Sequence, residues 1–497
     1  MAYLGNRPEL SDKMSSILAD PYFGRTYTYT PLHRITNSYL NKVQLSPRVG
    51  FRYDWNGDQQ LILRGGAGLF TGRIPMAWLA YAFYNNGDSY GGFDQKADQK
   101  PFAAGSNPLQ GGPNGIAGFI QQNGALTNNP NSGKTQVDLI DNGFVMPQVM
   151  RSSLGLDYTT DDQWKLGLEA IYTKNIKDVL FQQLNVQDNP TYYGYDTNHQ
   201  QPVYSGTVDQ RFSNIYLLSN TSKGYRYSLT GTISKNITDQ FQASVSYTYG
   251  QSKDLSNGVR NSMESNWQLN QSLVPNNPVL ANSNFDIRNR IVSTFSYNKA
   301  WNKAGKTNVS LFFSAQSGSP FTYGIVNNSM QGLPQQVSLA FIPERADAIR
   351  YFQDNAVTGT AAQQADAFNQ MIDGDSYLSS RRGNFTERNK ARTPWNVQAD
   401  LHVSHDVFMT ATKKQFITLT ADIMNLTNLI SKSWGIQYFS PNTFNSTASV
   451  GLTPELFPPA QNPGMYPRYQ FTTPGKPYSI DYYGSRTQLQ FGARYTF

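Results

Sequence analysis

Segments of about 10 to 14 residues in which apolar and polar side chains alternate recur along this chain, two by two, with a short turn inside each pair. In the last segment, Leu489, Phe491, Tyr495 and Phe497 share one face, and polar residues share the other. Successive side chains of a strand point to opposite faces, so each segment predicts a strand with one apolar and one polar face. We expect antiparallel strands at residues 46–56, 60–71, 149–160, 164–186, 223–235, 239–252, 286–299, 307–319, 394–406, 415–428 and 485–497.

Long polar stretches separate the strand pairs, at residues 73–147, 188–222, 253–284, 321–392 and 431–483. Connections this long are uncommon in compact domains. Short turns on one side and long loops on the other are typical of a transmembrane β-barrel. We therefore predict an all-β chain that contributes about eleven strands to an antiparallel barrel, with one short helix in the loop at 346–371. The alternation is imperfect, because Ile171, Val292 and Phe312 fall on the polar face.

The composition fits this class. Charged residues make up 15% and aromatic residues 13% of 497, which argues against disorder. The longest apolar run, at 76–84, is too short to cross a bilayer as a helix. A soluble β-sandwich or propeller is the alternative, but its turns would be of similar length at both ends. Aromatic side chains near the strand ends predict two interfacial girdles. These are Trp55, Trp164, Tyr172, Tyr249, Tyr297, Trp301, Trp395 and Tyr495.

The sequence predicts no enzyme and no cofactor. Cysteine is absent, which excludes thiol chemistry and disulfides. The G-x-S-x-G match at 87–91 and the P-loop-like ending at 132–135 lack the strand and helix contexts that those motifs need. Asp54, Asn56 and Asp58 alternate like calcium ligands, but a tight turn explains all three. His402 and His405 are expected on opposite faces of one strand, where they cannot share a metal ion.

The net charge of +7 is spread over single residues, so we expect no nucleic-acid partner, and an anionic membrane surface is favoured.

Four groups of segments resemble one protein family. The segments 45–58 (LSPRVGFRYDWNGD) and 63–75 (LRGGAGLFTGRIP) resemble TonB-dependent outer-membrane receptors of the Oar-like group. So do 377–383 (YLSSRRG) with 387–389 (ERN) and 392–395 (RTPW), 422–428 (DIMNLTN), and the ending FGARYTF. Thr427 stands where the family's penultimate strand usually has an aromatic residue.

The resemblance implies a barrel of 22 strands preceded by a plug domain, a TonB box and a signal peptide, and none of the last three is recognised in this sequence. It assigns residues 45–497 to the C-terminal portion of the barrel and 1–44 to the remnant of an extracellular loop. Leu489, Phe491, Tyr495 and Phe497 resemble the signal that the barrel-assembly machinery reads. The implied partners are outer-membrane lipid, that machinery, an extracellular solute, and the TonB complex, which would act through an upstream plug region.

The function that follows is binding and energised uptake of a large solute, an oligosaccharide or a peptide, by an outer-membrane receptor joined to its plug. The sequence does not assign the residues that bind this solute. A structural or adhesive outer-membrane barrel without transport is the alternative, and a secreted β-rich glycan-binding or hydrolytic protein is a third possibility. The predicted strands are odd in number and the first and last run in the same direction, so we expect the chain not to close a barrel by itself.

Overall fold

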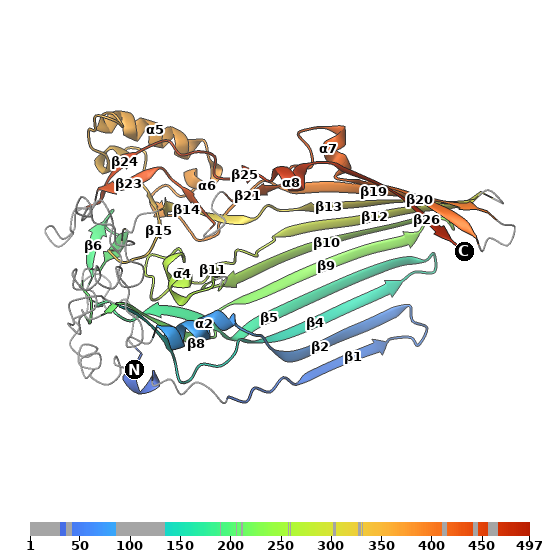
Figure 1. Cartoon of the computed structure of the whole chain (residues 1–497), viewed down its shortest axis with the longest axis horizontal. Coiled ribbons are helices and arrows are strands. Elements are labelled where there is room, and N and C mark those ends of the chain that lie inside the picture. The colour runs from blue at the N-terminus through green and yellow to red at the C-terminus, as the bar shows by residue number, and fades with distance from the viewer. Residues whose placement is uncertain are drawn as a thin grey trace, which may run out of the picture.

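The structure, a computed structural model, is an elongated, curved β-sheet with a folded region at one end (Figure 1). It describes residues 30–35, 42–85, 135–188, 190–204, 206–209, 212–256, 258, 260–301, 305–326, 330, 332–409, 415–440, 446–455 and 466–497.

Eleven strands follow one another across the sheet in chain order, each antiparallel to the next. All eleven predicted strands are confirmed, with bounds that differ from the expected ones by at most a few residues. The strands are β1 (Arg48–Asp54), β2 (Leu61–Thr71), β4 (Gln148–Thr159), β5 (Trp164–Gln183), β9 (Tyr225–Asn236), β10 (Phe241–Asp254), β12 (Asn289–Ala300), β13 (Gly305–Gln316), β19 (Asn396–Phe408), β20 (Phe416–Met424) and β26 (Gln488–Thr496).

The two faces of the sheet differ as the alternation predicts. On one face, large apolar side chains stand uncovered: Leu168 is 50% exposed and Ile233 is 50% exposed. On the other face, hydroxyl groups pair across strands, as between Thr230 and Thr248, whose Oγ1 atoms are 2.9 Å apart. No second layer covers the apolar face in the described part of the chain, which argues against a soluble sandwich, because such a face would need burial in water.

The expected aromatic side chains form the edges of the apolar band. All eight are more than a third exposed. Lys235 lies over the ring of Trp164 at 4.7 Å and Lys299 over the ring of Trp301 at 5.0 Å. From Trp164 to Tyr172 the strand β5 advances about 27 Å, which a barrel tilt of about 40° reduces to about 20 Å. That height is close to the apolar band of a membrane barrel, roughly 25 Å.

Short turns close the strand pairs at one end of the sheet, at the right of Figure 1. In the first of them, the carboxylate of Asp54 accepts hydrogen bonds from the backbone N–H groups of Gly57 (3.0 Å) and Gln59 (2.9 Å). Asp58 accepts from the N–H of Gln60 at 2.8 Å. The spacing of these acidic residues therefore serves the turn, in which Gly57 has a φ of 77°.

The sheet is open. β1 and β26 are its two edges, and no described residue of one pairs with the other. Both strands run toward the end with the short turns, as an odd number of antiparallel strands requires (Figure 1).

The described parts of the long polar stretches contain several helices and short strands, which corrects the expectation of one short helix. The expected segment contains the 3-10 helix η2 (Ala348–Tyr351) and the helix α5 (Ala361–Asp373), which a capping box at Thr360 and Gln363 begins. Other helices occur in this connection and elsewhere in the chain, and some of them, but not all, bury apolar residues such as Trp78 and Trp267. These helices are α2 (Met76–Tyr84), α4 (Met263–Gln268), α6 (Ser376–Ser379), α7 (Leu426–Ile430) and α8 (Tyr482–Ser485), besides η1 (Leu32–Arg34).

Short strands complete this region, which we call the head, defined as the described residues of the long connections at the left of Figure 1. Two of them, β3 and β8, extend the main sheet, where they pair in parallel, and β11 pairs with β10. They are β3 (Thr135–Ile140), β6 (Thr191–Gly194), β7 (Gln200–Val203), β8 (Phe212–Thr221), β11 (Ala281–Asn282), β14 (Pro320–Val326), β15 (Val337–Leu339), β16 (Phe341–Ile342), β17 (Asn384–Phe385), β18 (Ala391–Arg392), β21 (Tyr438–Phe439), β22 (Thr447–Ser449), β23 (Leu452–Glu455), β24 (Arg468–Phe471) and β25 (Ser479–Ile480).

The head has hydrophobic cores of its own. Phe321, Phe368 and Tyr469 belong to the largest cluster of buried side chains, and Trp78 and Trp267 belong to another. Ile35, from the segment assigned to a loop remnant, is fully buried in a third cluster. The head is therefore a packed unit at the end of the sheet.

The faces can be tested with two neighbouring substitutions in β9. Leu229 is 47% exposed on the apolar face, and Thr230 points to the polar face. We expect Leu229→Arg to lower the stability of the inserted sheet by roughly 1–3 kcal/mol, because an arginine on a barrel exterior costs about 2–4 kcal/mol at mid-bilayer depth and about 0–1 kcal/mol near the interfaces, and Leu229 is opposite Tyr249 at the edge of the apolar band. Thr230→Arg is the control and should cost far less. The amount of complete receptor assembled in the outer membrane, read as protection from protease, measures both, and equal amounts would contradict the assignment of faces.

Candidate functional site: the polar face and its junction with the head

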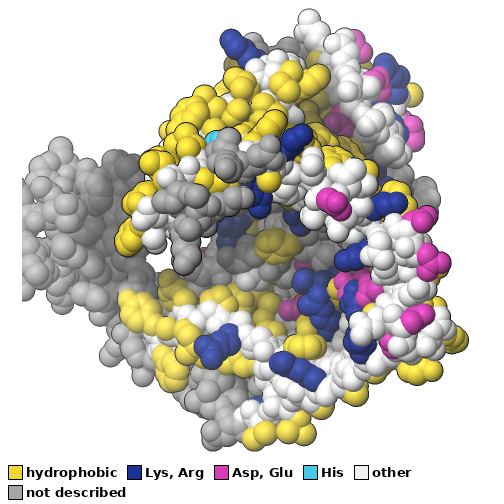
Figure 2. All heavy atoms as spheres, turned by 90° about the vertical axis from the view of Figure 1, so that its right-hand side faces the viewer, with side chains coloured by type: hydrophobic (Ala, Val, Ile, Leu, Met, Phe, Trp, Pro, Cys, Tyr) yellow, Lys and Arg dark blue, Asp and Glu magenta, His cyan; other side chains and the backbone are white. Residues whose placement is uncertain are grey.

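The polar face is hollowed, and Lys and Arg side chains gather in and beside the hollow when the molecule is viewed from the end with the short turns (Figure 2). In the middle of this face, Arg64 of β2 lies between two carboxylates. Its Nε donates to Asp157 at 2.8 Å and its Nη1 donates to Glu169 at 2.6 Å. Glycine at position 155 makes room for this arrangement, since a Cβ there would lie 2.8 Å from the guanidinium carbon of Arg64. Arg64 is thereby neutralised within the sheet.

Four residues closer to the head along the strands, two more arginines lie in a single row across the sheet. The register pairs Arg151 of β4 with Thr173 of β5, and Thr173 with Arg226 of β9. Both arginines are exposed, and no ion pair to either is found among the described residues. They line a cavity of about 440 Å³. Its lining is Phe70, Val149, Arg151, Ile171, Thr173, Arg226, Tyr227, Ser228, Thr248, Gly250, Gln251, Ser252, Phe285, Asp286 and Ile287.

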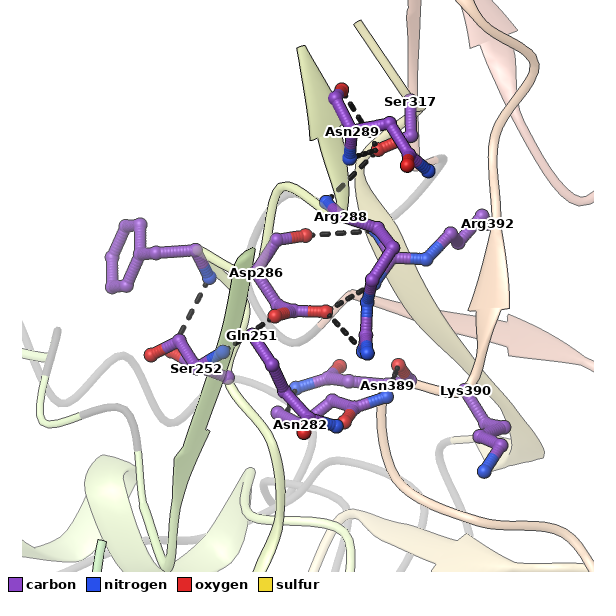
Figure 3. Close-up of polar contacts among 12 residues, drawn as sticks. Gln251, Ser252, Asn282, Asp286, Arg288, Asn289, Ser317, Asn389, Lys390 and Arg392 are labelled. Carbon is purple, nitrogen blue, oxygen red and sulfur yellow. Dashed lines mark hydrogen bonds and ion pairs between the residues drawn. The ribbon is translucent and has the colours of Figure 1, made fainter. Parts of the chain in front are cut away.

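The cavity is bordered on the head side by a buried carboxylate. Asp286, whose side chain is 0% exposed, binds the guanidinium groups of Arg288 (2.9 Å) and Arg392, and it accepts from the backbone N–H of Ser252 at 2.6 Å (Figure 3). Arg392 also donates to the carbonyl oxygen of Asp286 at 2.8 Å. Opposing effects act on Arg392: burial lowers its pKa, and the carboxylate of Asp286 raises it, with a net lowering.

A second buried ion pair lies beside the first. Arg388, 3% exposed, binds Asp254 at the end of β10. Next to it, Asn389 and Asn282 exchange hydrogen bonds: the side-chain amide of each donates to the backbone carbonyl oxygen of the other, at 2.8 Å from Asn389 and 3.1 Å from Asn282 (Figure 3). Asn389 has a φ of 56°, a conformation that asparagine tolerates. Together the two ion pairs fasten the segment before β19 to the tops of β10 and β12.

The segments 377–383, 387–389 and 392–395, singled out by their resemblance to a family loop, thus have structural partners. Besides Arg388 and Arg392, Arg381 pairs with Glu387 at 2.8 Å, and Arg382 pairs with Asp373 of α5 at 2.9 Å. The partners of these segments could not be predicted from the sequence, because they lie up to 134 positions away along the chain.

A buried acidic group lies in another part of the head. Burial raises the pKa of Asp138, in β3, to about 6, although hydrogen bonds from Asn85 and Gln136 oppose the rise. Glu264 adds repulsion, and its own pKa is raised by burial. The carboxyl of Asp138 therefore becomes protonated at a higher pH in the folded head than an ordinary aspartate does.

The residues predicted as an insertion signal lie on the edge strand β26 and just beyond it. Leu489, Phe491, Tyr495 and Phe497 are 57%, 77%, 54% and 91% exposed, on the apolar face. The role itself stays a prediction.

His402 and His405 are on opposite faces, as predicted, since His402 contacts Asp422 at 2.5 Å and His405 contacts Thr307 at 2.8 Å. The motif at 87–91 and residues 132–134 of the P-loop-like segment lie outside the described residues. Within the described ranges, no group of three potential metal ligands is found, and no helix is long and apolar enough to cross a membrane.

Comparison with known proteins gives a family. The family model described as an outer membrane beta barrel domain matches residues 23–456. No curated protein matches the chain.

Several solved structures resemble the chain at low sequence identity and low TM-score. The ferric enterobactin receptor PfeA of Pseudomonas aeruginosa is 12% identical, with a TM-score of 0.33 over 77% of this chain and 34% of that one. The outer membrane transporter YddB of Escherichia coli is 10% identical, with a TM-score of 0.39 over 89% and 41%. BauA, the ferric preacinetobactin receptor of Acinetobacter baumannii, is 9% identical, with a TM-score of 0.34 over 91% and 36%. This chain therefore corresponds to less than half the length of each of these three proteins.

The junction of the head with the sheet can be tested through Asp286. We expect Asp286→Ala to loosen the head by roughly 3–5 kcal/mol, because it leaves two partly buried arginines without their carboxylate. Arg345→Ala is the matched control, since it breaks an ion pair to Asp373 in which Arg345 is 66% exposed, and such pairs contribute about 0–1 kcal/mol. Limited proteolysis of the head in the complete receptor, with the heat-dependent gel mobility of the whole barrel as a reference, measures the effect. Equal cleavage rates in the two variants would contradict this role.

Asp138 makes the stability of the head depend on pH. Its folded-state pKa, about 6, lies above the ordinary value of 3.8, so its contribution to stability is full below that ordinary value and declines as the pH rises through 6. We expect Asp138→Asn to stabilise the head at pH 8 by at most about 3 kcal/mol, and the gain to vanish near pH 4. Hydrogen exchange of β3 and β8 at both pH values measures it. A gain that does not depend on pH would show that Asp138 is not the titrating group.

Proposed function

We propose that the chain, which belongs to the outer membrane β-barrel domain family and is located in the outer membrane, forms part of the wall of a receptor that binds a large solute and takes it up with energy. The solute would be an oligosaccharide or a peptide, and the receptor would be of the TonB-dependent type, in its Oar-like group. The observation that carries the proposal is the combination of a hollow, charged polar face with a packed head at one end of the strands (Figures 1 and 2).

Each part of that combination has a use in uptake. The apolar face, bounded by aromatic side chains, fits the lipid. The polar face offers a wetted path lined by arginines, hydroxyl groups and amides. The head has its own cores, so it can hold a binding surface in place, as a mobile loop could not. A barrel with a purely structural or adhesive role would need the first and third of these features but not the second.

The open sheet supports a larger barrel. In lipid, the unpaired backbone groups of β1 and β26 would each cost several kcal/mol, so both edges need partners. We propose that residues 45–497 are the C-terminal portion of a barrel of about 22 strands, that 1–44 belong to an extracellular connection, and that an upstream plug region contacts the TonB complex. Leu489, Phe491, Tyr495 and Phe497 would be read by the barrel-assembly machinery during insertion.

Uptake in whole cells tests this function. Cells that carry the complete gene should bind labelled oligosaccharides or peptides at their surface with or without energy, and should internalise them only when the inner membrane is energised and TonB is present. Deletion of the gene should remove both steps. Surface binding without energy-dependent entry would support the structural or adhesive alternative instead.

A further inference from the structure

We propose that the cavity between β4, β5, β9 and β10 is a binding site for an anionic solute, whose carboxylate or phosphate group Arg151 and Arg226 hold and whose apolar part contacts Ile171. This inference rests on the proposed function, because it names the chemical class of solute that the receptor takes up.

Arg151 and Arg226 are close enough to bind one anionic group together. Arg151 and Arg226 lie two strands apart in the row that Thr173 completes. Neighbouring strands are about 4.8 Å apart, so the two Cα atoms are separated by about 10 Å. The length of an arginine side chain lets two guanidinium groups at that separation approach one anionic group above Thr173. Planar guanidinium groups bind carboxylate and phosphate oxygens in pairs, which makes them the usual donors for such groups.

Most charged groups around the cavity are bound to groups other than these two arginines. The other charged groups nearest to it already have partners: Arg64 has Asp157 and Glu169, and Asp286 has Arg288 and Arg392. Asp178 interacts electrostatically with Arg226, but its carboxylate is bound by Asn175 and by the backbone N–H of Val179.

A further guanidinium group, that of Arg48, lies 4.4 Å from the ring centre of Phe70, which lines the cavity. The guanidinium groups around the cavity therefore outnumber the described carboxylates, Asp178 included, and the cavity has an excess of positive charge.

Part of the cavity lining is apolar. Ile171 departs from the alternation, since it is an apolar side chain on the polar face, and it lies one row from the two arginines. Phe70, Val149, Phe285 and Ile287 add apolar surface around it. Hydroxyl groups of Ser228 and Thr248 complete the wall. An anionic group with an apolar group next to it matches this lining better than a neutral sugar, which would leave the arginines without a partner.

The volume fits one part of a larger solute. About 440 Å³ is within the range of small-molecule pockets, which runs from about 300 to 1,000 Å³. The site would thus hold an acidic group, with its apolar neighbour, of a peptide or oligosaccharide whose remainder contacts the head.

Three water-soluble probes test the proposal on the complete receptor, isolated from outer membranes: 1-naphthyl phosphate, 1-naphthoate and the neutral 1-naphthyl β-glucoside. Fluorescence anisotropy reports their binding. We expect at least one anionic probe to bind about tenfold or more tighter than the glucoside. Preference for the phosphate or for the carboxylate probe would distinguish the two sources of negative charge. Equal binding of all three probes, or no binding of either anion, would overturn the proposal.

Variants locate the binding. We expect the double variant Arg151→Gln, Arg226→Gln to weaken binding of the anionic probe about tenfold or more, and the double variant Arg151→Lys, Arg226→Lys to retain part of it. Lys165→Gln, eight positions from Thr173 on the same strand and face, is the matched control and should bind as the parent does. The same substitutions are made in the complete receptor, whose heat-dependent gel mobility verifies that each variant is folded.

Loss of binding in Lys165→Gln to the same extent, or none in the arginine variants, would overturn the site. Failure of this test leaves energy-dependent uptake by whole cells measurable, so the two proposals can fail separately.

Discussion

The backbone hydrogen bonds between neighbouring strands are the constraint on which the rest of this structure depends. In a bilayer no water satisfies an unpaired N–H or C=O group, so the membrane-spanning part must be a continuous antiparallel ladder. The ladder fixes which side chains share a face, and it therefore separates the apolar face from the polar one. It also explains why helices, bulges and buried ion pairs are concentrated in the head, where irregular backbone can find side-chain partners and water.

The same constraint decides how much of the fold the sequence could predict. An alternation of period two persists over 7 or more residues in each membrane strand, and the short turns leave little freedom between paired strands, so all eleven strands were predictable. The head was not, because its contacts join distant parts of the chain. Trp78 donates to the carbonyl oxygen of Arg260, 182 positions away, and the hydroxyl groups of Tyr195 and Tyr469 meet across 274 positions. No local pattern reports such contacts.

The candidate site shows the same limit. The arginine-rich segment before β19 stood out by resemblance, yet its role as a fastening depends on Asp254 and Asp286, which the sequence places in a different connection. Arg151 and Arg226 come from different strand pairs, and only the register of β5 with β9 brings them into one row. The alternation in the sequence predicts which charged residues lie on the polar face near the loop end of a strand. It does not predict which of these residues come close together.

Departures from the alternation carry information of a different kind. On a face that only meets water, an apolar residue gains nothing from its position, and Ile171, Val292 and Phe312 would be accidents. Ile171 differs from the other two because it borders a cavity in which arginines lack carboxylate partners. In water alone the apolar side chain gains nothing and the arginines are merely hydrated, whereas an anionic, partly apolar group would cover the first and bind the second. The apolar side chain of Ile171 on the polar face and the excess of positive charge therefore both indicate an occupant in which an anionic group lies next to an apolar one.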